Sequence, residues 1–290
     1  MKKNSLSIVI TTFNRCEKLK KLISSIVVPK SLNYEIIIIN DGSEDDTRKF
    51  LDKYKRKKNF ILINQENLGR SVSLMKGVKV ASKEYTMIMD DDDYFLKSSL
   101  NYINKILGKK KSNFYIFNTK ISKNEDNFYY LNKKKTNFLK LRADLKIKKD
   151  FKEIVNTKLI KNAFIKYSKI ISNNRRIPTG LIWSEISKKN NSLFFSKKII
   201  KKNYLIDGLT EKSSLLKFFY PIPMAAMYLN YIKNRNYNSY LQRIKYKILY
   251  IRYNFHSQRS VKIFSYKIFL TFVAFLIYLI DKVILEFKKK

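Results

Sequence analysis

The sequence predicts an α/β fold with a Rossmann-like, open, mostly parallel sheet, followed by a basic helical C-terminal region. Residues 1–100 alternate apolar, β-branched runs with amphipathic stretches. The four isoleucines at 36–39 are typical of a strand buried on both faces of a parallel sheet. Residues 212–280 contain eleven Lys and Arg but no Asp or Glu. Because 45% of the 290 residues are hydrophobic, the chain can bury a sizeable core.

The elements of the first hundred residues follow from the period of their apolar positions. Runs rich in Ile, Val and Leu predict strands, whereas Leu19, Leu22 and Ile26 recur at the spacing of one helix face. In chain order we expect strands over 6–12, 34–40, 60–64 and 85–89, separated by helices over 15–28, 44–54 and 70–81. Strands and helices that alternate in this way predict parallel neighbours joined by right-handed crossovers.

Beyond residue 100 the pattern is less regular. We expect strands over 113–118 and 127–131, a helix over 151–169, an extended stretch over 192–206, and helices over 225–232, 240–253 and 268–280. Only six Gly and four Pro occur, so the sequence shows no long flexible linker. We predict one domain over 1–220 and a basic, aromatic helical region over 221–290.

The charge balance predicts a polyanionic partner, since the formal net charge is +38. Anionic lipid or nucleic acid would both attract such a chain. Its single Cys and single His exclude a zinc-binding set, and no RNA-recognition or arginine-rich signature is present, so nucleic acid is not expected. The apolar run at 6–10 is too short for a secretory signal, so we expect a cytoplasmic protein, peripheral on the anionic inner face of the cell membrane.

The last apolar segment, residues 268–280, indicates how the chain meets that membrane. It contains thirteen uncharged residues, whereas about 20 are needed to span a bilayer. We therefore expect a helix that lies in the membrane plane or re-enters it. A helix buried in the protein is the alternative.

Polar motifs follow four successive predicted strands, at 11–15, 40–43, 67–70 and 90–93. Open α/β sheets bind ligands at the carboxyl ends of their strands. The last motif is four adjacent aspartates, which repel one another unless a cation or hydrogen bonds neutralise them. A divalent metal that holds a phosphorylated ligand would do so, because Mg²⁺ and Mn²⁺ prefer oxygen ligands. A solvated acidic turn is the alternative.

These motifs, in this order and spacing, resemble the inverting family 2 glycosyltransferases, which have the A-type nucleotide-sugar fold. The resemblance covers residues 5–100 and is carried by the stretches 7–15, 35–47, 67–69 and 89–94, with Gly77 and Ala81 between the last two. It implies that residues 1–100 bind a nucleotide-sugar and that 101–220 form the acceptor half.

The resemblance also implies roles for individual residues. In the family the first loop contacts the nucleotide base, which implies Thr11, Phe13 and Arg15 here. The remaining nucleotide-binding residues would be Asp41, which accepts a hydrogen bond from the base, Asn67, and Asp90 and Asp91 near the ribose. Asp92 would bind Mg²⁺ or Mn²⁺ directly, with Asp93 supporting it. The alternatives are that Phe13 packs in the core and that Asp41 caps a turn or helix.

Two departures from the family pattern concern charged residues. Relatives carry an Arg shortly before the glycine that corresponds to Gly77, where this chain has 73–75 Ser-Leu-Met. Arg70, one helical turn earlier, is the candidate substitute. A base that deprotonates the acceptor is also required for inversion. Thr179 stands where the family pattern leads one to expect Glu, so we nominate Glu185, with Asp207 second.

The resemblance implies transfer of a sugar from a nucleotide-diphospho-sugar, with UDP as the expected nucleotide. The acceptor would be a glycan or a polyprenyl-linked glycan in bacterial surface polysaccharide synthesis, such as lipopolysaccharide or capsule. Trp183 would either line the acceptor pocket or pack internally. Two alternatives stand beside this hypothesis: a basic nucleic-acid-binding protein, and a sugar-nucleotide nucleotidyltransferase. The latter would require a glycine-rich loop after the first strand, and residues 11–15 contain no glycine.

Overall fold

A computed structural model describes residues 4–109, 112–121, 132, 134–143, 150–202, 217–234, 239–258 and 268–287. The chain divides into two compact units. Unit 1 comprises Met1–Thr136, Lys148–Arg176 and Asn190–Asn203, and unit 2 comprises Asn137–Ile147, Ile177–Lys189 and Tyr204–Lys290. These units differ from the division at residue 220 expected from sequence, because two internal segments group with the C-terminal helices.

Unit 1 is built on one sheet, which has nine strands in the described residues and the order β3-β2-β1-β4-β8-β6-β9-β5, with β7 beside β9. The strands are β1 (Ser5–Thr12), β2 (Asn33–Asp41), β3 (Phe60–Gln65), β4 (Tyr85–Asp90), β5 (Tyr94–Phe95), β6 (Phe114–Ile121), β7 (Lys135–Thr136), β8 (Lys152–Asn156) and β9 (Ser192–Lys202). Strands β1 to β4 pair in parallel, as do β6 and β9, whereas β8 is antiparallel to both of its neighbours. The predicted open, mostly parallel sheet is confirmed.

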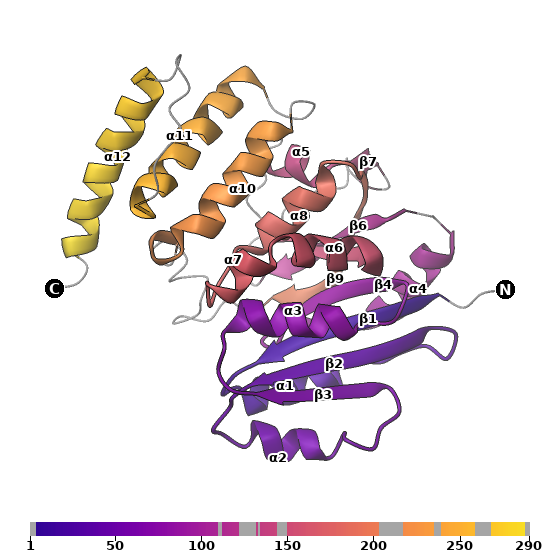
Figure 1. Cartoon of the computed structure of the whole chain (residues 1–290). Coiled ribbons are helices and arrows are strands. Elements are labelled where there is room, and N and C mark those ends of the chain that lie inside the picture. The colour runs from indigo at the N-terminus through magenta and orange to yellow at the C-terminus, as the bar shows by residue number, and fades with distance from the viewer. Residues whose placement is uncertain are drawn as a thin grey trace. The chain divides into compact units, whose positions relative to one another are not determined.

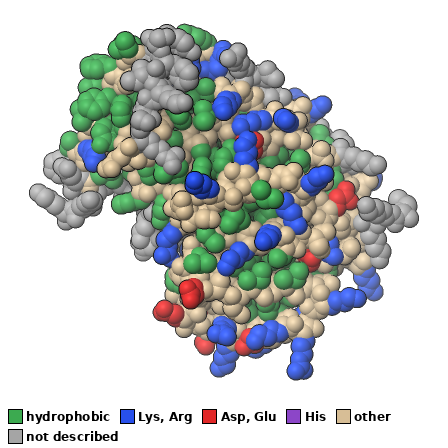
Figure 2. Space-filling view, in the orientation of Figure 1, with side chains coloured by type: hydrophobic (Ala, Val, Ile, Leu, Met, Phe, Trp, Pro, Cys, Tyr) green, Lys and Arg blue, Asp and Glu red, His purple; other side chains and the backbone are tan. Residues whose placement is uncertain are grey.

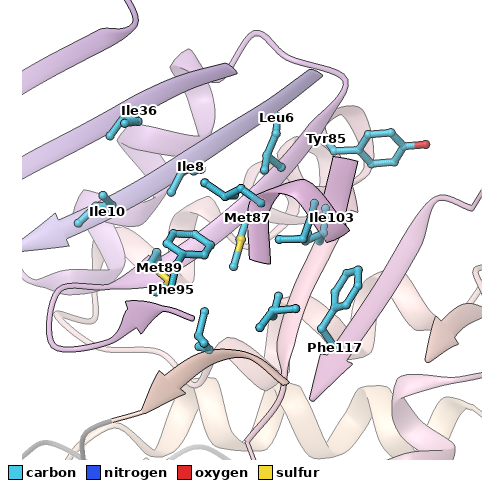
Figure 3. Close-up of a cluster of buried hydrophobic side chains, with 14 of the residues drawn as sticks. Leu6, Ile8, Ile10, Ile36, Tyr85, Met87, Met89, Phe95, Ile103 and Phe117 are labelled. Atoms are coloured by element: carbon cyan, nitrogen blue, oxygen red, sulfur yellow. The ribbon is translucent and has the colours of Figure 1, made fainter. Parts of the chain in front are cut away.

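Helices pack on the sheet of unit 1 (Figure 1). They are α1 (Cys16–Ser24), α2 (Thr47–Asp52), α3 (Arg70–Val80), α4 (Ser99–Lys109), α6 (Thr157–Lys166) and α7 (Ser168–Ser172). The side chains of Ile8 and Ile10 on β1 share one buried cluster with Leu19 of α1 and Ile103 of α4. Figure 3 shows part of this cluster, which the central strands and α4 form together.

The opposite face of the sheet carries α3. A Cβ placed on Gly77 would lie 2.5 Å from Ile39 Cδ1 and 2.6 Å from Val9 Cγ1, so the helix approaches β1 and β2 at a point where no larger residue fits. Because alternate residues of a strand point to opposite faces, Val9 meets α3 while Ile8 and Ile10 meet the other layer. The buried isoleucine strand is thus covered on both faces, as predicted.

Unit 2 is helical in its described residues. Its helices are α5 (Phe138–Ala143), α8 (Thr179–Ser187), α10 (Pro221–Lys233), α11 (Tyr240–His256) and α12 (Ile268–Phe287). Helix α10 packs against α8 and α11, and α11 packs against α12. The ring of Tyr228 on α10 stacks on Tyr246 and Tyr253 of α11. Ser239 and Gln242 form a capping box that starts α11.

The predicted helix over 151–169 is wrong at its start. Residues Lys152–Asn156 form strand β8, and the helix begins only at Thr157. Asn156 ends the strand and caps the helix, since its side chain accepts a hydrogen bond from the Lys158 backbone N–H at 3.1 Å. The extended stretch predicted over 192–206 is confirmed as far as Lys202, and the strand predicted over 127–131 lies outside the described residues.

The last helix is longer than the uncharged segment that predicted it. Helix α12 has 20 residues and continues past Asp281 and Lys282. By length and composition it is sufficient to cross a membrane, since Ile268–Leu285 has a mean hydropathy of 2.4, and only 11% of that stretch is buried. Helix α12 is therefore not a helix buried inside the protein, which was the alternative expected from the sequence. Figure 2 shows hydrophobic side chains gathered over α12.

Candidate functional site

The carboxyl ends of the parallel strands in unit 1 bring the predicted motifs together. Asn14 links the loop after β1 to the loop after β2, because its backbone N–H donates to Ser43 Oγ at 2.9 Å and its Oδ1 accepts from the Glu44 N–H at 2.8 Å. Asn14 has a φ of 49°, a left-handed conformation that Asn tolerates better than most residues. The two loops are therefore fixed to each other before a ligand arrives.

Asp41 ties the end of β2 to the loop after β3. Its Oδ1 accepts from Gln65 Nε2 at 2.6 Å and from the Leu68 N–H at 3.0 Å, while its Oδ2 accepts from the Gly69 N–H at 3.0 Å. The side chain is buried. Asp41 therefore holds the adjoining loop in place, a role close to the turn-capping alternative. A carboxylate has about four lone-pair positions, so Asp41 can still accept a further hydrogen bond.

Asn67 lies in the same loop and is held by Arg175, from the segment after α7. The Arg175 guanidinium donates to the Asn67 backbone oxygen at 3.1 Å and also to its side-chain oxygen. The Arg175 carbonyl accepts from the Ser71 N–H at 3.3 Å, and a Cβ on Gly69 would come within 2.6 Å of that oxygen. The glycine therefore lets this segment close over the start of α3.

The four aspartates differ in exposure. The side chains of Asp91 and Asp93 are 5% and 3% exposed, whereas those of Asp90 and Asp92 are 31% and 20% exposed. Arg15 Nη1 lies 2.8 Å from Asp91 Oδ1 and 3.3 Å from Asp92 Oδ2. The first loop, predicted to meet the nucleotide, therefore also contacts the acidic motif directly, and Asp90 and Asp92 are the members that a ligand can reach.

Three further cations surround Asp90. Arg70 Nη2 lies 2.5 Å from its Oδ1, and Lys202 Nζ lies 3.7 Å from its Oδ2. Burial would raise the pKa of Asp90, but the charges of Arg70, Lys152 and Lys202 lower it far below its usual value. Arg70 thus occupies the vicinity of the acidic motif, as expected for a substitute of the missing arginine.

The pKa values of the other three aspartates are raised, in contrast to that of Asp90. Burial raises the pKa of Asp91. Burial and the neighbouring charges of Asp90 and Asp91 raise the pKa of Asp92. Burial also raises the pKa of Asp93, to about 6. The motif therefore carries concentrated negative charge that a further cation beside Asp92 would stabilise.

The residues of the predicted base pocket differ in their accessibility. Phe13 is 41% exposed, so it does not pack in the core and its ring is available for stacking on a base, whereas Thr11 is buried at the end of β1. Trp183 is 4% exposed, which favours internal packing over an open acceptor pocket.

The first candidate base lies in unit 2. Glu185 is on α8 of unit 2, where its Oε2 lies 2.7 Å from Lys188 Nζ. The same ammonium donates to Asn230 Oδ1 at 2.6 Å, so Glu185 belongs to a network between α8 and α10. Its side chain is 17% exposed. Asp207 lies outside the described residues, and the choice between these two bases stays a prediction.

Sequence reasoning missed two lysines at the acidic motif. Lys152 begins β8 and Lys202 ends β9, and both approach Asp93. Lys152 was hidden by the wrong helix assignment, which the Asn-Thr pair at 156–157 could have corrected as a helix start signal. Nothing distinguishes Lys202 in a chain with 61 Lys and Arg.

The site could hold a divalent cation together with the phosphates of a bound ligand. No group of three or more His, Cys, Asp and Glu side chains among the residues that the structure describes is arranged to hold a metal. Mg²⁺ is commonly bound by one or two carboxylates together with substrate phosphates and water. The partly exposed Asp92 offers one such carboxylate, so the donor set fits a metal that arrives with a diphosphate.

Comparison with known proteins decides the family. The model of glycosyl transferase family 2 matches residues 7–168. The chain belongs to this family. It is therefore a family 2 glycosyltransferase. The family match supports neither the nucleic-acid-binding nor the nucleotidyltransferase alternative.

Relatives of this family 2 glycosyltransferase match only part of its length. A poly-beta-1,6-N-acetyl-D-glucosamine synthase of Staphylococcus aureus (strain COL) is 36% identical over 88 residues, which are 30% of this chain and 21% of that protein. The uncharacterized glycosyltransferase MG060 of Mycoplasma genitalium is 31% identical over 119 residues, 39% of this chain and 40% of that protein. The matches thus span about a fifth to two fifths of these relatives.

Solved structures confirm the A-type glycosyltransferase fold. Residues 1–349 of S. aureus TarS in complex with UDP-GlcNAc give a TM-score of 0.65 at 17% identity, covering 93% of this chain and 79% of that one. The mannosyltransferase PcManGT of Pyrobaculum calidifontis in complex with GDP-Man and Mn²⁺ gives 0.53 at 11% identity, covering 87% and 71%. At such identities the likeness establishes the fold.

Proposed function

We propose that this glycosyltransferase moves one sugar from a UDP-sugar to a glycan or polyprenyl-linked acceptor in bacterial surface polysaccharide synthesis. The reaction inverts the anomeric carbon and requires Mg²⁺ or Mn²⁺. The observation that carries this proposal is that Arg15, after β1, and Arg70, after β3, both pair with the aspartates at 90–93, after β4, in a family 2 chain. The structure of TarS with UDP-GlcNAc supports UDP as the nucleotide, and that of PcManGT with Mn²⁺ supports the cation.

In this proposal the chain binds the nucleotide through the loops after β1, β2 and β3. The exposed ring of Phe13 stacks on the base, and Thr11 and Asp41 contribute acceptors near it. Asn67, held by Arg175, borders the same site. Arg15 lies between this loop and the acidic motif, so its guanidinium can contact the ligand there while it restrains Asp91.

The acidic motif serves the diphosphate. Asp90, which is 31% exposed, faces the ribose, whereas the buried Asp91 acts on that side of the site through its ion pair with Arg15, and Asp92 holds the cation. When bound, the cation would stabilise the negative charge of the leaving nucleoside diphosphate. The protein contributes a rigid, partly buried carboxylate whose neighbours favour an added positive charge.

A donor panel tests the proposal. Purified full-length protein is incubated with UDP-, GDP- and dTDP-sugars, with Mn²⁺, with Mg²⁺ or with EDTA, and nucleotide release is measured. We expect hydrolysis of a UDP-sugar that depends on the cation. Asp92→Asn should lower the rate by about 100-fold, whereas the matched control Asp52→Asn, at an exposed position on α2, should not. Wild-type activity without a cation, or full activity of Asp92→Asn, would contradict the metal-binding role.

The catalytic base is proposed to be Glu185, with Asp207 as the second candidate. Glu185→Gln keeps the shape of the side chain, and its hydrogen bond to Lys188 can persist through the amide oxygen. If Glu185 deprotonates the acceptor, transfer should slow by about 100-fold while UDP binding is unchanged. Asp207→Asn is the parallel variant. Loss of transfer in the Asp207 variant alone would assign the base to that residue.

The location is proposed to be the cytoplasmic face of the cell membrane, where a lipid-linked acceptor would be available. Two features support this. Residues 212–280 contain eleven Lys and Arg and no acidic residue, which favours anionic lipid. The exposed apolar side chains of α12, including Phe269 (73% exposed) and Phe272 (58% exposed), favour insertion into the bilayer.

A further inference from the structure

Helix α12 packs on α11 through one of its faces. On that face Ala274 is fully buried and Asp281 is 5% exposed. The ring of Tyr278 has its centroid 5.7 Å from that of Phe255 and 4.8 Å from that of His256, both on α11. Residues 274, 278 and 281 follow one another at intervals of four and three, so they share one face of the helix. This face of α12 is therefore the one that meets α11.

The opposite face of α12 is apolar and exposed. Phe272, Leu279 and Val283 recur at helical spacing and are 58%, 44% and 52% exposed. With 3.6 residues per turn, the exposed apolar side chains of α12 cover about half of the helix circumference. Lys282 is exposed too, but its Nζ lies 5.8 Å from the ring centroid of Tyr278, toward the face that meets α11. A continuous apolar face of this length is typical of a helix that inserts into lipid.

Asp281 attaches α12 to α11 by charge. Arg252 Nε donates to Asp281 Oδ2 at 2.6 Å, and Arg252 Nη2 pairs with Asp281 Oδ1. His256 Nε2 lies 2.9 Å from the same Oδ2. If α12 entered a membrane without α11, the carboxylate of Asp281 would lie unpaired within the apolar stretch Ile268–Leu285, at a high cost in free energy. We therefore expect the two helices to meet a membrane together.

Helix α11 is too highly charged to cross a membrane beside α12. Its 17 residues include four Lys and Arg, which are Arg243, Lys245, Lys247 and Arg252. Each Lys or Arg at the centre of a bilayer costs about 2.5–3.5 kcal/mol. A helix that lies in the plane of the interface inserts only its apolar face, so α11 can remain beside the headgroups. Length and hydropathy alone would allow α12 to span, but the helix attached to it favours an orientation in the plane.

We propose that α12 lies in the plane of an anionic membrane leaflet. Its exposed face enters the acyl chains, α11 remains on the side of the headgroups, and both ends of α12 stay on the same side of the membrane. Anionic lipid is the partner that the charge favours, because residues 212–280 contain eleven Lys and Arg and no Asp or Glu. This orientation rests on the proposed membrane location and adds to it how the protein is anchored.

Sidedness in cells separates this orientation from a span. The full-length protein with Cys16→Ser receives one new cysteine, either at Lys288, beyond the end of α12, or at Val27, a 72% exposed site in unit 1 that serves as the matched control. Each variant is expressed in bacterial cells, and a membrane-impermeant maleimide is added to spheroplasts or to inside-out membrane vesicles. We expect neither cysteine to react in spheroplasts and both to react in inside-out vesicles. Reaction of Lys288→Cys in spheroplasts, with Val27→Cys protected, would show that α12 spans and would overturn the inference.

Depth in vesicles tests the exposed face of α12 directly. In the same Cys16→Ser protein, nitroxide labels are placed on single cysteines at Phe272, Leu279 or Val283. Lys245→Cys is the control, because Lys245 is an exposed residue of α11. When vesicles with anionic lipid are added, we expect the labels on α12 to become protected from a water-soluble relaxation agent. Their depths should be similar, about 5–10 Å below the headgroups, while the label on α11 stays accessible.

Three results of the depth measurement would contradict the orientation. Phe272 and Val283 lie about 16 Å apart along the helix, so a steady change of depth from one to the other would show a steeply inserted helix. Protection of the labels before vesicles are added would assign the exposed face to a second copy of the chain. Labels that stay accessible on vesicle-bound protein would mean that another surface contacts the lipid. By contrast, a wild type that binds no vesicles and is recovered only in the soluble fraction of cells would refute the proposed location itself.

Discussion

Asp41 combines two requirements in one side chain. Its carboxylate receives backbone N–H groups from Leu68 and Gly69 and the side-chain amide of Gln65, so it shapes the loop that borders the nucleotide site. Removing a buried acceptor of this kind lowers the stability of the fold, because its N–H donors are then left buried without a hydrogen-bond partner. In the proposed nucleotide site, the loop and the ligand would therefore depend on the same carboxylate.

Replacement of Asp41 by Asn tests this dual role. The amide group would place N–H donors against the Leu68 or Gly69 N–H, so we expect the free energy of unfolding to fall by about 1–3 kcal/mol. UDP affinity should fall as well, as measured by calorimetry beside urea unfolding. Asp46→Asn is the control, since Asp46 is exposed and makes no side-chain cap to α2. Wild-type stability in Asp41→Asn would show that these hydrogen bonds are not required.

Glu35 gives stability a dependence on pH. It is 6% exposed and accepts hydrogen bonds from Ser7 Oγ and the Ser82 N–H, both at 2.6 Å, and from Ser82 Oγ at 2.8 Å. Burial acts to raise the pKa of Glu35, but these hydrogen bonds and the charge of Lys83 lower it below its usual value. The folded state therefore binds the Glu35 proton less readily than the unfolded state does.

The sign of the effect follows from this direction. Glu35 contributes stability above its unfolded pKa of about 4.3, and the contribution is lost as the pH falls through the lower pKa of the folded state. We expect Glu35→Gln to lower the free energy of unfolding by about 1–2 kcal/mol at pH 7 and by less near pH 3.5, in urea titrations. A difference between the two proteins that stays constant with pH would contradict the assignment.

Helix α3 is an element whose position depends on a single glycine. Ala at Gly77 would gain about 1 kcal/mol in helix propensity. Its Cβ would overlap side chains of Val9 and Ile39, both 0% exposed, at 2.6 and 2.5 Å, and overpacking of this kind costs about 1–3 kcal/mol. The steric cost exceeds the propensity gain.

We therefore expect Gly77→Ala to destabilise unit 1, and α3 to shift away from β1 and β2. The measurement is urea unfolding, with UDP affinity as a second readout because α3 starts at the nucleotide loop. Gly108→Ala in α4 is the matched control: its Cβ would meet only the end of the Asn4 side chain, at 3.0 Å, so its effect should be smaller. Equal stability of the two variants would refute the close-packing argument.

Element by element, the sequence predicted well where the signal was local. The isoleucine strand and the helices with a clear apolar face were recovered within a few residues, because burial on one or both faces leaves a visible period. The error at β8 arose where five residues of strand run directly into a helix, so the periodic signal of the longer element dominated. The cap at Asn156 was the available correction.

The site was predictable only in part, for a different reason. Asp41 and the aspartates at 90–93 stand out because each follows a predicted strand. Lys152 and Lys202 reach the same motif from strands that join the sheet later in the chain, beside β4 and beside β6. Such long-range pairing has no local signature, so which lysines neutralise the motif is a tertiary property that the three-dimensional structure reveals.

At the scale of the whole molecule, the proposed membrane association would draw on both charge and hydropathy. The net charge of +38 provides long-range attraction to anionic lipid, which salt screens. The exposed apolar face of α12 provides a short-range contribution, which salt does not weaken. Within unit 2, Asp281 of α12 lies 2.9 Å from His256 of α11 and also pairs with Arg252. The one acidic side chain of Ile268–Leu285 is therefore turned toward α11.

The two contributions can be separated with vesicles. We expect the wild type to sediment with vesicles that contain anionic lipid at low salt, and a fraction to remain bound at 1 M salt. Phe269→Asp combined with Phe272→Asp should remove the salt-resistant fraction, since each buried Phe contributes about 1.5–3 kcal/mol. Binding at low salt should persist, because the double variant keeps most of the positive charge. Val27→Asp, at a 72% exposed site in unit 1, is the matched control. Salt-resistant binding of the double variant would mean that this face of α12 does not enter the bilayer, and complete release of the wild type by salt would leave electrostatic attraction as the sole membrane contact.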